Sequence, residues 1–249
     1  MLALVDMDLL LYRVGYTTMD DPQWVAGARC DEMMDNILHR TAATGWKGFI
    51  SDSRENNFRT HLYPFYKTNR KQEKPTHYEF LKEHLITKWC AQIAHGMEAD
   101  DALGIHQDKR EREEYADSYD TVICSIDKDL LTVPGLHYNF VKDQFIEVDL
   151  REGTRRFYTQ MLTGDTSDNI RGCRGIGPVK AEKALSSLTE ETDLLEAVYD
   201  LYQKQEDGMS SEEILQHMLL AGRLLRIKQE EGEKLWGFPM SNQIAVAFA

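Results

Sequence analysis

Three short apolar segments, each ending at an aspartate, constrain the fold of this chain more than any other feature. They are LALVD (2–6), KGFISD (47–52) and TVICSID (121–127). Such continuous apolar runs are typical of strands buried on both faces, as in a parallel sheet. In open α/β sheets the active groups collect where the parallel strands end. The segments therefore predict a central parallel sheet with carboxylates along one edge.

The stretches between these strands have the spacing of helices, over 28–43, 76–95 and 98–107. This alternation predicts βαβ crossovers around the sheet. Residues 135–149 follow as a hairpin or edge pair with its turn near Lys142 and Asp143. Strand signals then fade, and helices are predicted over 153–163, 178–188, 191–205 and 211–229. We therefore expect an α/β domain over 1–152 and a helical domain over 153–249, whose uncharged end either packs back on the body or is disordered.

Composition limits the classes of protein to consider. The 249 residues are 42% hydrophobic, enough for a sizeable core, and carry a formal net charge of −13. No apolar run is long enough to span a membrane, and Asp6 and Asp8 interrupt the N-terminal apolar stretch, so we expect a cytoplasmic protein without a secretory signal. The four cysteines form no CxxC pair, which favours reduced thiols over a zinc site. The acidic balance argues against non-specific binding of nucleic acid over the whole surface.

Carboxylates recur at the expected ends of strands and helices. Asp6, Asp52, Asp127 and Asp129 follow strands, Glu98, Asp100 and Asp101 begin a helix, and Asp165 and Asp168 stand in GDTSDN. Caps and turns explain any one pair as well as a metal site does. The whole set is harder to explain in that way, because hard cations such as Mg²⁺ prefer carboxylate oxygens and a pair of ions needs several acids. Two such ions can clamp a phosphodiester during its hydrolysis.

A basic segment, YPFYKTNRKQEKP (63–75), follows the second predicted strand. Lys67, Arg70, Lys71 and Lys74 would share one face if the segment were helical. The aromatic residues just before them could stack on unpaired bases. The alternative is an ordinary solvated helix with aromatic residues in the core.

The stretch GDTSDNIRGCRGIGPVKAEKAL places Gly172, Gly175 and Gly177 just before Pro178 and a helical run. Glycines allow close approach of a ligand, and the free amides at a helix N-terminus attract phosphate. This pattern predicts a helix-hairpin-helix that grips a nucleic-acid backbone without reading its sequence. The surrounding cations would be Arg171, Arg174, Lys180 and Lys183.

Taken together, LVDMD, FISDS, YKTNRK, EADD, SIDKD and GDTSDN leading into GIGP make the chain similar to the flap endonuclease and 5′→3′ exonuclease family, in a compact phage-type form. The matching stretches cover residues 4 to about 185 in the family's order. The resemblance implies an α/β fold, with a PIN-like, mostly parallel central sheet flanked by helices. An arch or clamp at about 63–95 would stand above the site, and a helical domain with a helix-hairpin-helix type motif would follow.

Carried over residue by residue, the resemblance implies roles for individual side chains. The metal ligands would be Asp6, Asp52, Glu98, Asp100, Asp101, Asp127, Asp129, Asp165 and Asp168. Lys67 and Arg70 would engage the scissile phosphate, with Tyr66 stacking on a base and Lys71 beside them on the nucleic acid. The implied cofactors are two Mg²⁺ ions, with Mn²⁺ as a substitute, and K⁺ at the hairpin. Two departures bear on the hairpin: Arg171 and Arg174 replace prolines, and Val179 replaces a lysine common in the family.

The resemblance implies a divalent-metal-dependent 5′ nuclease that acts on DNA with 5′ ends, flaps or RNA primers during phage replication, alongside replication proteins. The sequence leaves open exonuclease or flap endonuclease action, and DNA or RNA–DNA hybrid as substrate. One alternative is a phosphatase of the haloacid dehalogenase type, suggested by the DxD in LVDMD; Leu9 and Leu10 and the short spacing of GDTSD argue against it. The other is a non-catalytic nucleic-acid-binding module, which the full acid set disfavours because bare carboxylates weaken phosphate binding.

Overall fold

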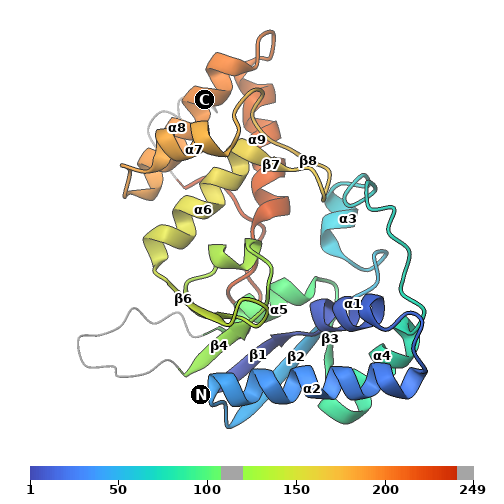
Figure 1. Cartoon of the computed structure of the whole chain (residues 1–249). Coiled ribbons are helices and arrows are strands. Elements are labelled where there is room, and N and C mark those ends of the chain that lie inside the picture. Colours follow the sequence, from blue (N-terminus) through green and yellow to red (C-terminus); the bar gives the residue numbers. More distant parts are fainter. Residues whose placement is uncertain (108–119, 240–249) are drawn as a thin grey trace. The chain divides into compact units, whose positions relative to one another are not determined.

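A computed structural model describes residues 1–107 and 120–239 of the chain. The chain forms two compact units (Figure 1). The first, which we call the sheet unit, comprises residues 1–58, 72–149 and 227–231. The second, the helical unit, comprises residues 59–71, 150–226 and 232–239 of those described. Each unit is described by itself.

Six strands form the sheet of the sheet unit, within the described residues, in the order β3-β2-β1-β4-β5-β6. They are β1 (Leu2–Asp6), β2 (Gly45–Ser51), β3 (Gln92–Ala94), β4 (Thr121–Cys124), β5 (Gly135–Asn139) and β6 (Gln144–Val148). All neighbours pair in parallel except β5 and β6, which form an antiparallel hairpin. Because strand side chains alternate between faces, Ala3 and Val5 pack on one side of the sheet and Leu4 on the other.

Helices cover both faces of this sheet. They are α1 (Met7–Thr17), α2 (Gln23–Thr41), α4 (Tyr78–Trp89) and α5 (Ala99–His106), with a short 3-10 helix η1 (Asp129–Thr132). Apolar residues of α1, α2 and α4 form the core on one face, whereas α5, η1 and Ile227 pack on the other. The fold class predicted from sequence is therefore confirmed: a mostly parallel central sheet is flanked by helices.

A polar junction joins α2 to α4 at the surface of this layer. The carboxylate of Asp31 contacts His84 Nε2 at 2.8 Å and accepts hydrogen bonds from Lys88 Nζ at 2.7 Å and Trp89 Nε1 at 2.8 Å. Partial burial raises the pKa of Asp31, but these partners outweigh it, so the pKa lies below its usual value. The junction thus holds Asp31 in its charged form.

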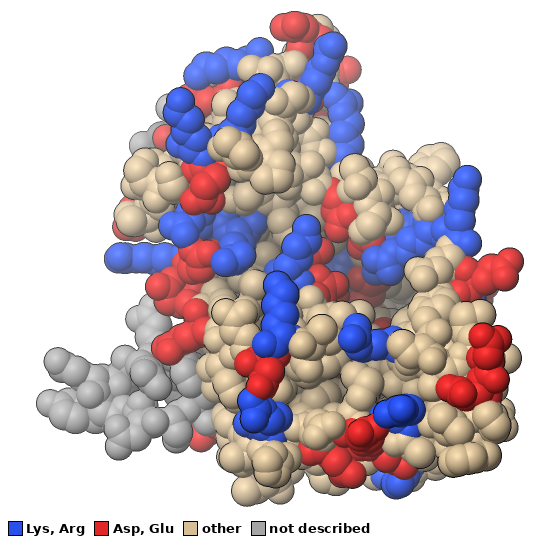
Figure 2. All heavy atoms as spheres, in the orientation of Figure 1, with Lys and Arg blue, Asp and Glu red and all other residues tan. Residues whose placement is uncertain are grey.

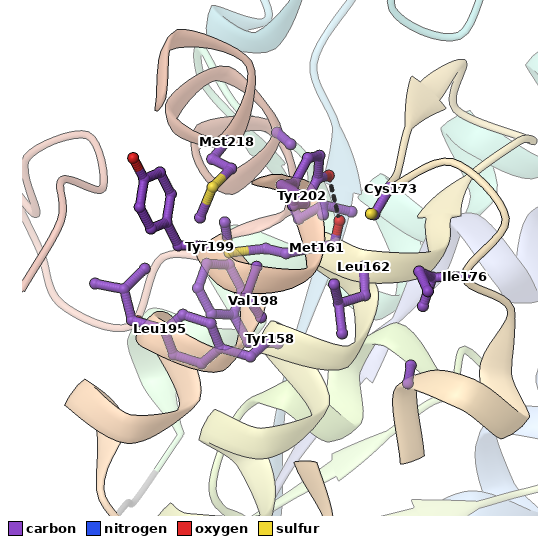
Figure 3. Close-up of a cluster of buried hydrophobic side chains, with 14 of the residues drawn as sticks. Tyr158, Met161, Leu162, Cys173, Ile176, Leu195, Val198, Tyr199, Tyr202 and Met218 are labelled. Atoms are coloured by element: carbon purple, nitrogen blue, oxygen red, sulfur yellow. Dashed lines mark hydrogen bonds between the residues drawn. The ribbon is translucent and has the colours of Figure 1, made fainter. Parts of the chain in front are cut away.

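The helical unit is built around α6 (Leu150–Thr163), α7 (Pro178–Leu185), α8 (Glu191–Gln205) and α9 (Ser211–Leu225). Figure 3 shows the core between them, where Tyr202 Oη donates to Met161 O at 2.8 Å. Helix α3 (Phe58–Leu62) is fixed to this unit by Arg59, which is 2% exposed and donates to Leu224 O and Arg226 O. Buried apolar packing stabilises these helices.

A two-stranded ribbon, β7 (Gly164–Asp165) with β8 (Ile170–Arg171), connects α6 to α7. The two strands approach so closely at Gly164 and Gly172 that a Cβ on Gly172 would lie 2.3 Å from Gly164 N and 2.5 Å from Leu162 O. Gly164 also has a φ of +66°, which side chains disfavour. Glycine is therefore required at both positions by packing within the protein.

Several sequence predictions need correction. Residues 63–75 are not helical, because a series of turns follows α3 and Lys67 takes a left-handed φ of +56°. Strand β4 ends at Cys124, not at residue 127. The last predicted helix, 211–229, ends at Leu225, since Arg226 turns to an extended conformation and residues 227–231 enter the sheet unit.

The remaining organisational predictions are settled only in part. The boundary near residue 152 stays a prediction; α6 begins at Leu150, while residues 59–71, expected partly in the arch of the first domain, cluster with the helical unit. The predicted packing of the C-terminal end falls on residues 240–249, which lie outside the described residues. None of the described helices is both long enough and apolar enough to cross a membrane. All four cysteines lie in the described residues, and all are free.

Candidate active site

Carboxylates follow four adjacent parallel strands of the sheet unit. Asp6 is the last residue of β1, Asp52 comes directly after β2, Glu98 lies just beyond β3, and Asp127 follows β4. The strand order β3-β2-β1-β4 makes these strands neighbours, and their parallel directions bring their C-terminal ends to one edge. The predicted row of acids along one sheet edge is therefore present.

Asp6 is the most strongly perturbed of these acids. Its side chain is 3% exposed, caps α1 by accepting a hydrogen bond from Leu9 N at 3.1 Å, and accepts a second from Ser125 Oγ at 2.9 Å. Burial, with the negative charges of Asp8 and Asp127, raises the pKa of Asp6 from 3.8 to about 7. Like charges therefore surround Asp6, and a proton or a cation at this place relieves their repulsion.

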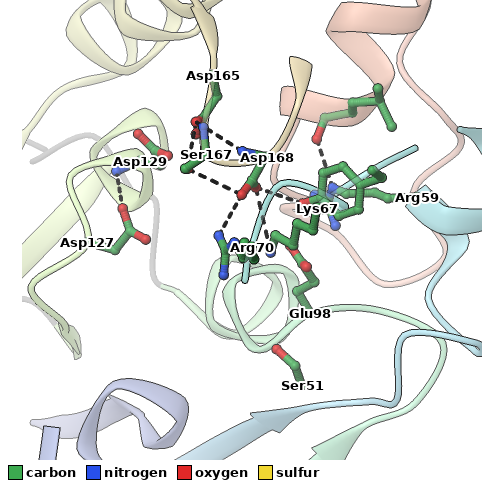
Figure 4. A network of polar contacts seen from close by, with 12 residues as sticks. Ser51, Arg59, Lys67, Arg70, Glu98, Asp127, Asp129, Asp165, Ser167 and Asp168 are labelled. Atoms are coloured by element: carbon green, nitrogen blue, oxygen red, sulfur yellow. Dashed lines mark hydrogen bonds and ion pairs between the residues drawn. The ribbon is translucent and has the colours of Figure 1, made fainter. Parts of the chain in front are cut away.

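Ser125 connects Asp6 to the loop after β4. Its Oγ accepts from Asp127 N at 3.0 Å, and Asp127 Oδ1 in turn accepts from Asp129 N at 2.8 Å (Figure 4). Asp127 and Asp129 do not continue an extended strand, because the chain turns after Cys124 and Asp129 begins η1. Hydrogen bonds from the backbone amides of these two acids, relayed through Ser125, connect this loop to Asp6 instead.

Asp8 and Ser51 form a second link at this edge. Asp8 Oδ2 accepts from Ser51 N at 3.0 Å, and Ser51 Oγ accepts from Ala99 N at 2.9 Å, at the start of α5. Serine thus holds two of the acid-bearing segments together, as Ser125 does on the other side of β1. These serines and Asp8 stand within FISDS, SIDKD and LVDMD, but the sequence argument assigned roles only to the other acids of those motifs.

Asp52 uses its carboxylate to hold two loops. One oxygen accepts from Ser53 N at 2.7 Å and Asn56 Nδ2 at 3.1 Å, and the other accepts from Gly96 N at 2.8 Å. The hydrogen bond from Gly96, followed by those from Asn56 and Ser53, lowers the pKa of Asp52. The ordinary structural explanation, a turn closed by an aspartate, therefore applies to Asp52 in this structure.

Glu98 and Asp101 form a capping box at the start of α5, in which Glu98 N donates to Asp101 Oδ2 at 3.2 Å. Asp101 is fully buried, and its other oxygen accepts from Lys228 N at 3.0 Å. Asp101 therefore fixes both the helix start and the segment 227–231. Asp100, between them in sequence, is half-buried.

The two remaining acids belong to the helical unit, in the turn 166–169 and just before it. Asp165 Oδ1 accepts from Ser167 N at 2.7 Å, Ser167 Oγ at 2.7 Å and Asp168 N at 3.3 Å. Asp168 contacts Arg70 at 2.5 Å and Lys67 Nζ at 3.6 Å, and also accepts from Tyr66 Oη at 3.0 Å (Figure 4). Both oxygens of Asp168 therefore have cationic partners, and a metal ion would compete with them.

These contacts change the role expected of Tyr66. Its ring is 2% exposed and packs in the core of the helical unit, so it presents no face on which a base could stack. Phe65, the preceding residue, is 62% exposed. Lys67 is held close to Asp168, whereas Lys71 is exposed.

The glycine-rich hairpin has the expected form. Gly175 has a φ of +70°, Gly177 is the N-cap of α7, and Pro178 is its first residue. Lys180 Nζ donates back to Gly175 O at 2.8 Å. Lys183 is exposed on the same helix, and Val179 is 84% exposed.

A buried acid that the sequence argument missed holds this hairpin. Glu206, 6% exposed at the end of α8, pairs with the guanidinium of Arg171 and accepts from Arg174 N at 2.9 Å. The guanidinium of Arg171 therefore has a structural partner within the protein, while the Arg174 residue contacts Glu206 through its backbone. The only signal for this role of Glu206 is that its side chain is buried at the end of an amphipathic helix, and burial cannot be read from the sequence.

Within residues 1–107 and 120–239, no group of three His, Cys, Asp or Glu side chains stands in an arrangement that could hold a metal ion. The predicted metal ligands, the cations Lys67 and Arg70, and the nucleic-acid contacts therefore stay predictions at the level of single residues. What the geometry shows is a hydrogen-bonded acid network in the sheet unit and a separate acid and cation network in the helical unit.

Comparison with known proteins decides the family. The family model described as the 5′-3′ exonuclease N-terminal resolvase-like domain matches residues 1–159. The chain belongs to this family. It is 31% identical over 168 residues to DNA polymerase I of Rhizobium leguminosarum, which is 62% of this chain and 16% of that protein. For the thermostable DNA polymerase I of Thermus aquaticus the identity is 31% over 182 residues, 68% of this chain and 21% of that protein.

Solved structures show the same fold for this 5′-3′ exonuclease family member. The bacteriophage T5 D15 protein co-crystallised with metal ions matches with a TM-score of 0.62 and 19% identity, over 89% of each chain. The T5 D15 flap endonuclease variant in a pseudo-enzyme-product complex with DNA and metal ions matches with a TM-score of 0.58 and 17% identity, over 89% of this chain and 88% of that one. The predicted resemblance and fold are thus confirmed.

Proposed function

We propose that the chain is a structure-dependent, divalent-metal-dependent 5′ nuclease that hydrolyses phosphodiesters near the 5′ end of a DNA strand, or of an RNA strand paired to DNA. Family membership supports this activity. The polymerases that the chain matches are much longer proteins, so their activities are not carried over whole. Lys, Arg and acidic side chains are interspersed on the face seen in Figure 2, which favours local substrate contacts over binding by the whole surface.

The observation that carries the proposal is the row of acids at the shared edge of four parallel strands, with the pKa of Asp6 raised to about 7 by burial and by its acidic neighbours. Oxygen donors with excess negative charge fit Mg²⁺, with Mn²⁺ as a substitute, better than softer metals. When bound, such ions activate water and neutralise charge on the leaving oxygen.

In this proposal the acids divide into three groups. Asp6, Glu98, Asp100, Asp127, Asp129 and Asp165 are the ligand candidates of the sheet and helical units. Asp52 and Asp101 support the site through the loops that their carboxylates hold. Asp168, with its two cationic partners, orients Lys67 and Arg70 toward substrate phosphate in addition to any contact with metal.

The hairpin before α7 is the proposed grip on duplex DNA. The amides at the N-terminus of α7 and the side chains of Arg174, Lys180 and Lys183 would contact the phosphate backbone, with Gly172, Gly175 and Gly177 keeping the loop close. Arg171 supports the loop through its pair with Glu206. The K⁺ ion expected at the hairpin would bind backbone carbonyls and stays part of the proposal.

The biological setting belongs to the proposal as well. A 5′ nuclease of this size suits removal of RNA primers or degradation of DNA during phage replication, in the host cytoplasm and beside replication proteins. The bacteriophage T5 proteins with the same fold agree with this setting.

The test uses 5′-labelled flap, nicked and RNA-primed duplexes incubated with Mg²⁺ or with EDTA. We expect Mg²⁺-dependent products cut near the 5′ end, and product sizes that separate exonuclease from flap endonuclease action. Asp127→Ala should abolish cleavage with folding intact, whereas Asp35→Ala, an exposed acid on α2, should cleave normally. Duplex binding without cleavage would indicate a binding module, and release of inorganic phosphate from small monoesters would indicate a phosphatase.

A further inference from the structure

Residues 65–70, the first part of the basic segment, are fastened to the turn 166–169 by side-chain amides. Asn69 Nδ2 donates to Thr166 O at 3.1 Å and to Asn169 Oδ1 at 3.2 Å. Asn169 Nδ2 donates in the opposite direction, to Phe65 O at 3.0 Å. Both pieces belong to the helical unit. We call this reciprocal pair of asparagines and their carbonyl partners the amide clasp.

The clasp closes around the two cations expected to meet the substrate. Lys67 lies between Phe65 and Asn69, the two ends of the clasp on this segment, and Arg70 directly follows Asn69. Lys67 N also donates to Asp168 O at 3.0 Å. Lys67 takes a φ of +56°, a left-handed conformation that a lysine adopts only where its surroundings hold it. Asn169 has a φ of +59°, which asparagine tolerates better than most residues.

The ion pair between Arg70 and Asp168 contributes little to holding this segment. The side chain of Arg70 is 54% exposed, and exposed ion pairs are weak and screened by salt. The hydrogen bonds from the two asparagine side chains go to backbone carbonyls and therefore hold the backbone of the segment. Because the side-chain amides are neutral, salt screens these hydrogen bonds less than it screens ion pairs. The clasp therefore sets the course of the backbone, and Asp168 then orients the two cationic side chains.

We propose that Asn69 and Asn169 are positioning residues, which hold residues 65–70 against the turn 166–169 so that Lys67 and Arg70 are presented to the substrate phosphate in one geometry. This inference rests on the proposed nuclease function. Presenting cations without reorganisation lowers the barrier of the chemical step more than it improves binding. Loss of the clasp should therefore lower the cleavage rate.

Three variants and one control test the clasp. Asn69→Ala removes two hydrogen bonds without straining the backbone, and Asn169→Gly removes the side chain but keeps the left-handed φ accessible. The third variant combines both changes. Asn36→Ala is the control, because Asn36 is an exposed asparagine on α2. Trypsin, which cleaves after Lys67, Arg70 and Lys71, measures local opening of the segment without reference to activity.

We expect each clasp variant to be cut by trypsin within 67–71 about tenfold faster than wild type, with an unchanged melting temperature, because local opening exposes the segment. Single-turnover cleavage of a 5′-flap duplex should slow about tenfold, while the dissociation constant in EDTA changes less than about twofold. The double variant should be little worse than either single one, because the two amides act together.

Three results would each overturn the positioning role. They are variants that trypsin cuts at the wild-type rate, additive effects in the double variant, and equal losses in binding and in cleavage. Absence of cleavage in the wild-type protein as well would overturn the proposed nuclease function, and the positioning role with it. In that case the trypsin result would still show whether the clasp holds the segment. The two failures are therefore distinguishable.

Discussion

The substitution Asp6→Asn should make the metal-free protein more stable at alkaline pH while abolishing its activity. The folded protein raises the pKa of Asp6 from 3.8 to about 7, chiefly by burial and then by the charge of Asp8. A carboxyl whose pKa is raised on folding stabilises the fold fully at low pH. That stabilisation is lost as the pH rises from 3.8 to about 7, because over this range the unfolded chain has released the proton that the buried carboxyl still holds.

The size of the effect follows from the two pKa values. Each pKa unit corresponds to about 1.4 kcal/mol, so ionising Asp6 costs the folded state at most about 4 kcal/mol above pH 8. Asn is nearly isosteric with Asp, and its carbonyl can still accept the hydrogen bond from Leu9 N that caps α1. Asp6→Asn removes the charge and with it most of that cost.

The assay is urea unfolding of wild type and Asp6→Asn at pH 5 and pH 8, each with EDTA and with Mg²⁺. In EDTA the wild-type free energy of unfolding should fall between pH 5 and pH 8, and the variant should change much less. Mg²⁺ should raise the unfolding free energy of wild type at pH 8 back toward its value at pH 5. It should leave that of the variant unchanged, since the variant lacks the charge that the ion offsets.

The exposed substitution Asp35→Asn is the matched control and should follow wild type throughout. The reasoning fails if the unfolding free energy of wild type in EDTA is the same at both pH values. It also fails if Asp6→Asn is less stable than wild type at pH 8.

Three further predictions concern other parts of the chain. Lys67→Ala should lower the single-turnover cleavage rate more than duplex affinity, and Arg174→Ala the reverse; equal effects on both quantities would contradict their separate roles. Gly172→Ala should cost at least about 1–3 kcal/mol in urea unfolding, because its Cβ would meet the backbone at Gly164, and a neutral result would refute that close packing. Asp31→Asn should lower the unfolding free energy at pH 7 by about 1 kcal/mol, a difference that should vanish as the pH falls below about 4.

Strands β1, β2 and β4 and the acids that follow them were predictable because the signals are local, whereas β3 (Gln92–Ala94) falls within the helix predicted over 76–95 and was missed. An apolar run such as LALVD, ended by Asp6, has few solutions other than a buried parallel strand, and β1 lies at those residues. The hairpin with its turn near Lys142 and Asp143 was predictable for the same reason, and β5 and β6 meet there.

The basic segment was not predictable, because contacts distant in sequence determine its shape. Spacing alone suggested a helix over 63–75, but Asn69 and Asn169, one hundred residues apart, bond the chain into turns. Tyr66 was expected to meet bases for its position in the segment, yet its hydroxyl pairs with Asp168 and its ring enters a core. Tertiary contacts of this kind override local propensity.

The same limit applies to the acids. Spacing cannot distinguish a carboxylate that holds a loop, such as Asp52 or Asp101, from one that could hold a cation, because both occur after strands and at helix starts. The hydrogen-bond partners decide, and they come from Gly96 and Lys228, residues in other segments. The serines that link the acids, Ser51 and Ser125, were hidden for the same reason.

The path of the chain determines when the sheet unit can finish folding during synthesis. Ile227 completes one core of the sheet unit and Lys228 N donates to the buried Asp101, although both residues follow α9 of the helical unit in sequence. A fragment that stops near residue 152 would leave a hole in that core and a carboxylate oxygen short of a donor. During synthesis the sheet unit therefore cannot finish folding until residues 227 and 228 have been translated, so a chain released before them should lack this core contact and the hydrogen bond to Asp101.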